Sequence, residues 1–360
     1  MKILTIVGAR PQFIKAAAVS RVLRERFQEV LVHTGQHYDG NMSQVFFDEL
    51  EIPRPDVNLG IGSGGHGAQT GAMLAAIEAI LLKEKPHRVL VYGDTNSTLA
   101  GALAAVKLHV PVAHVEAGLR SFNRRMPEEI NRILTDHVAD LLFCPSETAV
   151  ANLAAEGITR GVHPVGDVMH EALMHAVAMA ERKSGILDRL HLVPGGYALA
   201  TIHRAENTDD SVRLAHLVET LREVSLRMPV IFPVHPRTRV QLQAGGGGAG
   251  SSAGGDLRMI DPVGYLDMVR LEGGASVILT DSGGIQKEAY WLRVPCVTLR
   301  AETEWVETVQ QGWNALAGGD RDLILRGALA RVRPADGPDA YRGSGSVERL
   351  VQALGGDRAP

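Results

Sequence analysis

The chain has 360 residues, of which 45% are hydrophobic and 22% charged, and its formal net charge at pH 7 is −4. This length is sufficient for two domains, and the composition is that of an ordinary globular protein. The charge provides no long-range attraction for nucleic acid, and no stretch approaches the roughly 20 apolar residues of a membrane-spanning helix. We therefore expect a cytoplasmic protein with neither a nucleic-acid nor a membrane partner.

Apolar runs alternate with amphipathic helical patterns through the first half of the chain. The predicted strands are 3–7, 30–33, 89–92, 112–115 and 141–144. The predicted helices are 13–26, 69–83, 98–108, 128–138 and 147–156. This alternation predicts an α/β fold with a parallel, doubly wound sheet, whose loops gather at the carboxyl ends of the strands.

A second series of the same kind follows a long helical pattern. Its predicted strands are 197–201, 230–233, 257–260, 277–280 and 296–299, and its predicted helices are 211–227, 263–272, 285–292, 304–311 and 321–332. We expect two Rossmann-like domains facing across a cleft, at 1–166 and 191–340, with a connector at 167–190 and a final helix within 341–360. The glycine-rich stretch 244–255 predicts a flexible surface loop.

Cysteines and histidines show no metal-binding pattern. Cys144 and Cys296 each end an apolar run, so we expect buried thiols in a reducing compartment. The 14 histidines are scattered, without cysteine partners or an HExxH motif. No metal or other cofactor is predicted.

Carboxylates and cations follow the strands of the first predicted domain. Asp94 comes shortly after strand 89–92, Glu116 directly after strand 112–115, and Glu128 in the first turn of the next helix. The cations nearby are Arg10, Lys15, Arg120, Arg124, Arg125 and Arg132. The loop after the first strand is neither GxGxxG nor a Walker motif, but it places Arg10 and Lys15 around a helix start, where anions bind readily. Proton chemistry on an anionic substrate is predicted.

The second predicted domain has the features of a nucleotide-diphosphate site. Ser282 is suited to cap a helix, and Gly283 and Gly284 then let a ligand approach the exposed amides of its first turn. Glu288 lies one turn further on and can accept hydrogen bonds from ribose hydroxyls. At other strand ends lie further candidates for phosphate contacts or acid–base work, namely His203, Arg204, His235, Arg237 and Arg300.

Together these motifs resemble the non-hydrolysing UDP-N-acetylglucosamine 2-epimerases over essentially the whole chain. The matching segments are 8–11 with Lys15, 93–95, 114–120, 127–129 with 131–132, 203–204 with 206–207, and 280–284 with Glu288. The resemblance implies a GT-B fold and interconversion of UDP-GlcNAc and UDP-ManNAc by a homodimer without metal or NAD. It also implies anti elimination of UDP to 2-acetamidoglucal, followed by re-addition.

The resemblance also implies roles for the residues of this chain that match the family's motifs. Asp94, Glu116 and Glu128 match the acid–base carboxylates, and His203 matches the histidine near the UDP phosphates. The matches to nucleotide-sugar contacts are Arg10, Lys15, Arg132, Ser282, Gly283, Gly284 and Glu288.

The sequence departs from the best-known epimerases in three places. Residues 303–307 lack an expected Arg-Pro, Met268 replaces an aromatic residue expected against uracil, and Ala68 replaces an arginine beside Gln69 in the region linked to allosteric activation. These departures resemble the branch acting on UDP-2,3-diacetamido-2,3-dideoxy-glucuronate, whose carboxylate would suit Arg124 and Arg125. That activity is one alternative, and a GT-B glycosyltransferase is an alternative of another class.

Overall fold

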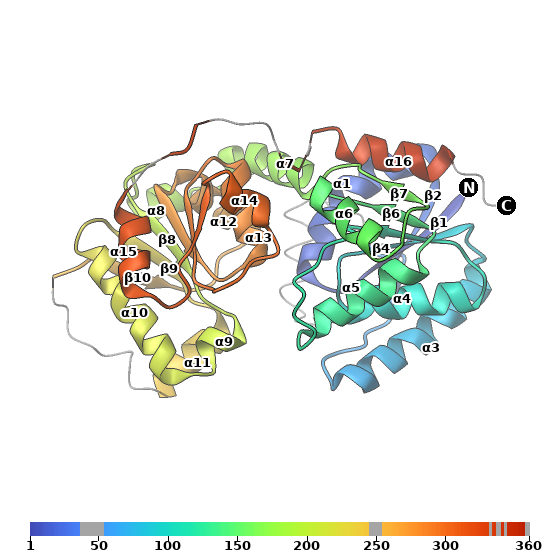
Figure 1. The fold of residues 1–360 in the computed structure, drawn as a ribbon, viewed down its shortest axis with the longest axis horizontal. Coiled ribbons are helices and arrows are strands. Elements are labelled where there is room, and N and C mark those ends of the chain that lie inside the picture. Colours follow the sequence, from blue (N-terminus) through green and yellow to red (C-terminus); the bar gives the residue numbers. More distant parts are fainter. Residues whose placement is uncertain (37–53, 245–253, 331–332, 336–339, 342–343, 357–360) are drawn as a thin grey trace. The chain divides into compact units, whose positions relative to one another are not determined.

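The computed structural model describes the chain except residues 37–53, 245–253, 331–332, 336–339, 342–343 and 357–360. It divides into two compact units. Unit 1 comprises Met1–Met174 with Asp339–Pro360, and unit 2 comprises His175–Pro338. Each unit is an α/β layer structure built on one parallel sheet (Figure 1).

Unit 1 contains a seven-stranded sheet in the order β3-β2-β1-β4-β5-β6-β7. The strands are β1 (Lys2–Val7), β2 (Gln28–His33), β3 (Val57–Asn58), β4 (Arg88–Tyr92), β5 (Val112–Val115), β6 (Leu141–Phe143) and β7 (Val162–His163). One face is covered by α1 (Arg10–Arg26), α6 (Glu147–Ala155) and α16 (Ser346–Gly356), and the other by α3 (His66–Glu84), α4 (Asn96–Lys107) and α5 (Pro127–Val138). Because helices cover both faces, the central strands are continuous apolar runs.

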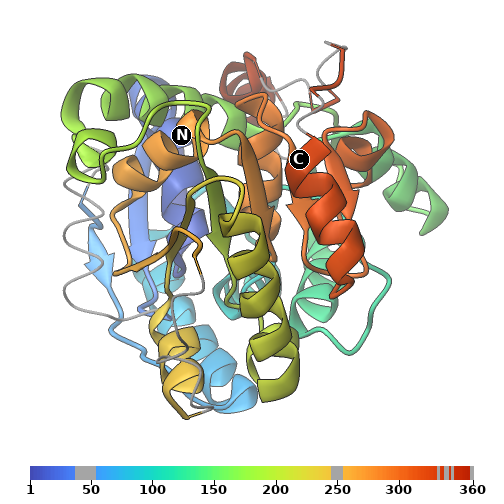
Figure 2. The ribbon, with the colours of Figure 1, turned by 90° about the vertical axis from the view of Figure 1, so that its left-hand side faces the viewer.

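Unit 2 contains a six-stranded sheet in the order β10-β9-β8-β11-β12-β13. The strands are β8 (Ala198–Thr201), β9 (Val230–Pro233), β10 (Leu257–Ile260), β11 (Val277–Thr280), β12 (Cys296–Thr298) and β13 (Asn314–Leu316). The helices are α8 (Ile186–Arg189), α9 (Ala205–Thr208), α10 (Ser211–Ser225), α11 (Pro236–Ala244), α12 (Tyr265–Gly274), α13 (Gly283–Trp291), α14 (Val306–Gln310) and α15 (Arg321–Ala330) (Figure 2).

Alternate residues of β8 feed two separate cores in unit 2. Ala198 and Ala200 pack with α10, α11 and α15, whereas Leu199 packs with α8, α12 and α13 on the other face. This period of two is what a strand buried between two helix layers requires. The sheet is therefore held from both sides, and its strand ends are fixed in position.

Strand order reverses once in each sheet, between β1 and β4 and between β8 and β11. At such a switch point the loops after adjacent strands diverge to opposite faces and leave a crevice at the carboxyl ends. The segments after β1 and β4 carry Arg10 and Asp94, and those after β8 and β11 carry His203 and Ser282. The predicted site residues therefore lie where a doubly wound fold binds ligands.

The last helix belongs to unit 1. The α7 helix (Val168–Lys183) contains the boundary between the units, and α16 packs on α1. Ser346 Oγ donates to the Asp167 carbonyl at 3.2 Å and to Glu171 Oε1 at 3.1 Å, which fixes the start of α16 against the start of α7. The C-terminal segment thus completes the first unit.

The prediction of an α/β fold with two doubly wound sheets is confirmed. The short strands β3, β7 and β13 and the helices α9 and α11 were not predicted, whereas α8 lies within the helical pattern of the predicted connector. The strands β3, β7 and β13 have only two or three residues each, too few for an alternating pattern to be recognised. In addition, β3 and β7 are edge strands that pair on one side only. The predicted glycine-rich loop 244–255 falls largely outside the described residues. No helix in the described part of the chain is both long and apolar enough to span a bilayer.

Candidate active site

Two turns with positive φ follow the neighbouring strands β4 and β5. Gly93 has φ +60° and Glu116 has φ +73°, in the left-handed region that residues with a Cβ seldom adopt. The Gly93 amide donates to the Val115 carbonyl and the Glu116 amide to the Phe143 carbonyl, both at 3.0 Å. These bonds fix the turns at the strand ends, and strain of this kind in a non-glycine residue is often found at functional sites.

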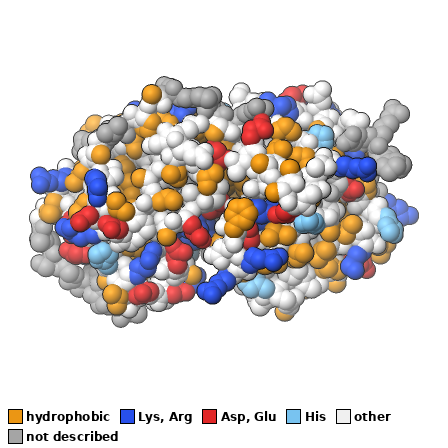
Figure 3. Space-filling model, in the orientation of Figure 1, with side chains coloured by type: hydrophobic (Ala, Val, Ile, Leu, Met, Phe, Trp, Pro, Cys, Tyr) orange, Lys and Arg blue, Asp and Glu red, His pale blue; other side chains and the backbone are white. Residues whose placement is uncertain are grey.

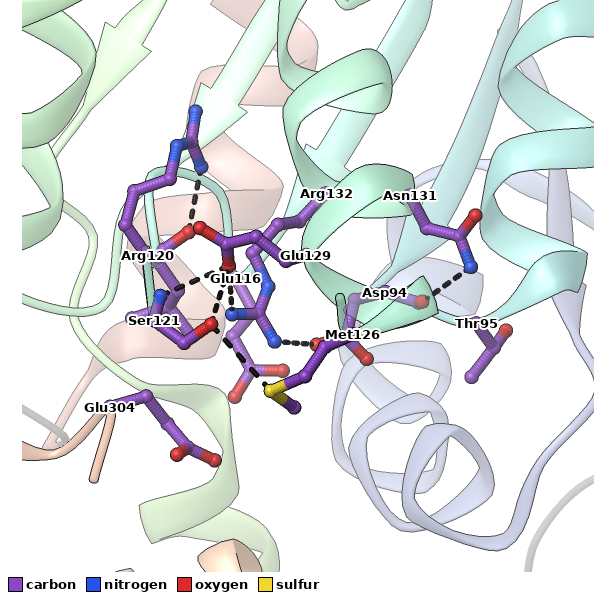
Figure 4. A network of polar contacts seen from close by, with 12 residues as sticks. Asp94, Thr95, Glu116, Arg120, Ser121, Met126, Glu129, Asn131, Arg132 and Glu304 are labelled. Carbon is purple, nitrogen blue, oxygen red and sulfur yellow. Dashed lines mark hydrogen bonds and ion pairs between the residues drawn. The ribbon is translucent and has the colours of Figure 1, made fainter. Parts of the chain in front are cut away.

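Asp94 and Glu116 each lie beside a cation, and Figure 4 shows Arg132 next to Asp94. Glu116 pairs with Lys15 of α1, and both side chains are 9% exposed. Asp94 pairs with Arg132 of α5, and its carbonyl accepts a hydrogen bond from Asn131 Nδ2 at 2.9 Å. A Cβ added to Gly93 would lie 3.4 Å from Glu116 Oε2 and 3.7 Å from Lys15 Nζ, so the Lys15–Glu116 pair lies against the Gly93 turn.

The adjacent glutamates at the start of α5 differ in their surroundings. Glu128 is half-buried, and the described part of the chain offers it no hydrogen bond or ion pair. Glu129 is buried and accepts from the amide and hydroxyl of Ser121, both at 3.0 Å, and from the Phe122 amide at 2.9 Å. It also pairs with Arg132 at 2.7 Å. Glu128 is therefore available for chemistry, and Glu129 anchors the loop before α5.

Gln12 connects the two segments at the switch point of unit 1. Its Oε1 accepts from the amides of Gly8 and Ala9 at 2.7 and 3.0 Å, and its Nε2 donates to the Tyr92 carbonyl at 2.7 Å. Gln12 was not predicted from the sequence. The predicted Arg10 begins α1, but its side chain lies outside the described residues.

Asp281 organises the corresponding loops of unit 2. Its buried carboxylate accepts from the backbone amides of His203 and Arg204 at 3.1 and 3.0 Å and from Asn207 Nδ2 at 3.0 Å. The loop after β8 is thus tied to the residue that follows β11. Asp281 lies inside a recognised motif, but its anchoring role was not predicted from the sequence.

His203 has a pKa below its usual value. Burial lowers the pKa most, the Asp281 carboxylate opposes this, and the nearby charges of Arg204, His235 and Arg237 lower it further. The His203 and His235 rings lie 6.0 Å apart. A neutral imidazole at this strand end can donate a hydrogen bond to an anion and can accept a proton.

The first turn of α13 is open at Gly284. Ser282 caps the helix by accepting from the Ile285 amide, and a Cβ added to Gly283 would meet Glu304 Oε1 at 2.5 Å. Gly283 is therefore packed against the Glu304 side chain, which would have to shift to admit a Cβ. Among the described residues, a Cβ at Gly284 would contact only Ser282 Oγ, at 3.8 Å. Because the first amides of a helix have no partner within it, this end is suited to an anion.

The structure brings the predicted residues together within each unit. Unit 1 places Lys15, Asp94, Glu116, Glu128 and Arg132 at one end of its sheet, and unit 2 places His203, His235, Ser282, Gly283, Gly284 and Glu288 at one end of its own. Glu288 is buried and accepts from the Tyr265 hydroxyl at 2.8 Å. Within the described ranges, no three His, Cys, Asp or Glu side chains are grouped as a metal site requires. Cys144 and Cys296 are buried, as predicted.

Comparison with known proteins gives one family over nearly the whole chain. The sequence model of the UDP-N-acetylglucosamine 2-epimerase family matches residues 21–355. The chain belongs to the UDP-N-acetylglucosamine 2-epimerase family. The resemblance seen in its motifs is thereby confirmed, and with it a GT-B-type fold and membership of a carbohydrate isomerase family.

Individual relatives align end to end. The chain is 56% identical to a UDP-N-acetylglucosamine 2-epimerase homolog of Methanococcus maripaludis, over 98% of this chain and 99% of that protein. It is 52% identical to the UDP-2,3-diacetamido-2,3-dideoxy-D-glucuronate 2-epimerase of Pseudomonas aeruginosa, again over 98% and 99%. The crystal structure of Methanocaldococcus jannaschii UDP-GlcNAc 2-epimerase in complex with UDP-GlcNAc and UDP superposes with a TM-score of 0.90 at 44% identity, covering 98% and 99%.

The charges around His203 predict opposite effects for two substitutions. Asp281→Asn keeps the size and one acceptor oxygen but removes the negative charge, so the pKa of His203 should fall further. Arg237→Ala removes a positive charge and should raise that pKa. An NMR titration of the His203 ring measures both, and shifts of the same sign in the two variants would contradict this electrostatic account.

Proposed function

We propose that this epimerase-family chain interconverts UDP-GlcNAc and UDP-ManNAc by eliminating UDP to 2-acetamidoglucal and adding it back, with no metal or NAD. The observation that supports it most is the set of three carboxylates at the switch point of unit 1. Asp94 and Glu116 are each beside a cation, and Glu128 has no recorded partner in the described chain.

The carboxylates supply the proton transfers. The hydrogen on C2 is weakly acidic, so a positioned base must remove it while the C1–O bond breaks, and such help is worth roughly 10²–10⁴ in rate. Inversion at C2 requires groups that reach both faces of the sugar, which one carboxylate does not easily do. Asp94, Glu116 and Glu128 together provide the necessary set, with Lys15 and Arg132 holding two of them in place.

Unit 2 stabilises the departing UDP. Negative charge develops on the β-phosphate as the bond breaks, and donors fixed in advance stabilise it without rearrangement. Such donors in unit 2 are the amides of Gly283 and Gly284 and the His203 imidazole. The positive end of the α13 dipole stabilises the same negative charge. We assign His235 to the same anion and Glu288 to the ribose hydroxyls, and we assign Arg10 of unit 1 to a contact with the nucleotide sugar.

The family assignment favours this reaction over the alternatives drawn from the sequence. A glycosyltransferase requires an acceptor, whereas the epimerase requires UDP-GlcNAc alone. The Pseudomonas aeruginosa relative makes the diacetamido glucuronate the appropriate comparison substrate. Arg124 and Arg125, both exposed, are the residues whose charge would attract a uronate.

The reaction predicts exchange of the C2 hydrogen with solvent. In heavy water, UDP-GlcNAc alone should acquire deuterium at C2 and yield UDP-ManNAc, as read by NMR and mass spectrometry. Glu128→Gln, which removes an acid–base group, should lower turnover about 10²–10⁴-fold. Glu147→Gln, in the first turn of α6, is the matched control and should leave turnover unchanged.

The outcome separates the hypotheses. Absence of deuterium at C2 together with transfer to an added acceptor would support a glycosyltransferase. Deuterium exchange at C2 of the UDP-diacetamido glucuronate, without exchange in UDP-GlcNAc, would support the alternative epimerase activity.

The open first turn of α13 predicts the effect of a side chain at position 284. Gly284→Val should lower UDP affinity at least about tenfold, or 1.4 kcal/mol, by calorimetry, because it fills the approach to the amides. Gly273→Val is the control, since Gly273 is also exposed in a helix and, of the residues that the structure describes, its added Cβ would approach only Leu292, at 4.0 Å. Equal UDP affinity in the two variants would contradict the proposal that the diphosphate binds at this helix end.

We further propose that the chain is a homodimer, the state that its family resemblance implies. An apolar surface formed by α3, α4 and α5, here called the three-helix face, supports this (Figure 3, lower right). Its exposed residues include Ala72, Ala75, Ala79, Leu82, Ile130 and Leu134. A second copy can cover such a face about a two-fold axis.

The three-helix face predicts a substitution that separates the protomers. Leu134→Asp would bury a charge in the interface and should shift the protein to monomer in size-exclusion chromatography with light scattering. Leu329→Asp on α15 is the matched control, because the two leucines are 44% and 39% exposed. A monomeric wild type, or a Leu134→Asp variant as dimeric as the control, would contradict the interface.

A further inference from the structure

His114 is a buried histidine that the proposed reaction does not use directly. It lies in β5, two residues before Glu116, and is 0% exposed. Its Nδ1 lies 2.7 Å from Asp136 Oδ1 of α5, and its Nε2 lies 2.7 Å from the Gly93 carbonyl. The ring therefore joins the turn that carries Asp94 to the helix that carries Glu128.

Both partners of the ring are acceptors. A carbonyl oxygen can only accept a hydrogen bond, and so can an ionised carboxylate. Burial alone raises the pKa of Asp136, but its hydrogen bonds and charge interactions with His114 and Arg120 outweigh this and keep the pKa below its usual value. A ring placed between two acceptors satisfies both of them only when each of its nitrogens carries a hydrogen.

Asp136 extends the network to the far side of Glu116. Its Oδ2 accepts from the Gly118 amide at 3.1 Å and from Arg120 Nη1 at 2.7 Å. Arg120 also pairs with Glu156, at 2.6 and 2.8 Å. Asp136 therefore holds residues on both sides of Glu116, whose positive φ requires a well-defined turn.

The charges in this network balance with His114 protonated. His114 and Arg120 then supply two positive charges, and Asp136 and Glu156 two negative ones. The nearby Cys144 adds none, because burial, with a contribution from Asp136, raises the pKa of its thiol to about 12. His137 lies beyond Glu156, 3.1 Å from its carboxylate and about half exposed. A neutral ring would leave either Asp136 or the Gly93 carbonyl facing a lone pair, which is costly in a buried site.

We propose that His114, held as an imidazolium between Asp136 and the Gly93 carbonyl, is a positioning residue that sets the relative placement of Asp94 and Glu116. The inference rests on the proposed function for the roles of those carboxylates. It adds a residue that touches neither substrate nor reacting atoms and acts through the two strand ends. It also explains why a histidine stands inside a strand whose neighbours are apolar.

The protonation state is tested without any activity. In ¹⁵N-labelled protein at the pH of the activity assay, the His114 ring should show two bonded N–H groups in a long-range nitrogen–proton spectrum, assigned by comparison with His114→Asn. A spectrum with one protonated nitrogen would overturn the imidazolium.

The positioning role is tested by kinetics. His114→Asn keeps a donor near the Nδ1 position but loses the bond to the Gly93 carbonyl, and kcat should fall about 10–100-fold, with KM and UDP affinity nearly unchanged. His109→Asn is the control, because His109 is an exposed histidine of unit 1 with φ +57°, which asparagine tolerates.

The two proposals fail in different ways. An unchanged kcat in His114→Asn, or a loss explained wholly by a lower folded fraction in thermal unfolding, would overturn the positioning role while leaving the epimerase intact. A wild-type enzyme without deuterium exchange at C2 would overturn the proposed function, and the nitrogen spectrum would still report on the ring.

Discussion

The hydrogen bonds that a buried aspartate makes to the segments at the strand ends of each unit are the interactions on which the rest of the structure depends. Loops that leave parallel strands carry amide groups that the sheet no longer pairs, and a buried amide without a partner is costly. Asp136 accepts from Gly118 and from the His114 and Arg120 side chains, and Asp281 accepts from the backbone of His203 and Arg204. Each carboxylate thereby holds its loop in place as a fixed support for the groups beside it.

This fixed support explains how groups in one small region can have different chemical characters. The Glu129 carboxylate accepts hydrogen bonds from the loop that it anchors, whereas its neighbour Glu128 has no hydrogen bond or ion pair within the described chain. Asp94 and Glu116 are held by cations and by strained or tightly bonded turns, so little reorganisation is needed when charge moves. In unit 2 the same principle leaves Gly284 open while Gly283 is packed against Glu304. The proposed division between proton transfer and UDP binding follows from these local differences.

The sequence was sufficient for the fold because its signals were local. Apolar runs and amphipathic helices predicted both sheets, and turn chemistry put Asp94, Glu116, Ser282 and Gly284 at strand ends. Short edge strands such as β3 carried no such signal. The anchoring roles of Gln12, Asp136 and Asp281 were missed because each residue bonds to a different element: the Gln12–Tyr92 bond spans 80 residues, the His203–Asp281 bond 78 and the His114–Asp136 bond 22. Hydrogen bonds between such separate segments leave no periodic pattern in the amino-acid sequence.

The most direct test of the account is a crystal structure of the Glu128→Gln enzyme with UDP-GlcNAc bound. The account predicts that C2 of the sugar lies within reach of the Asp94 and Glu116 carboxylates and of position 128. It also predicts that the diphosphate lies against the amides of Gly283 and Gly284, while the contacts of Asp136 and Asp281 are unchanged. A sugar bound with C2 away from all three of those side chains would contradict the central claim.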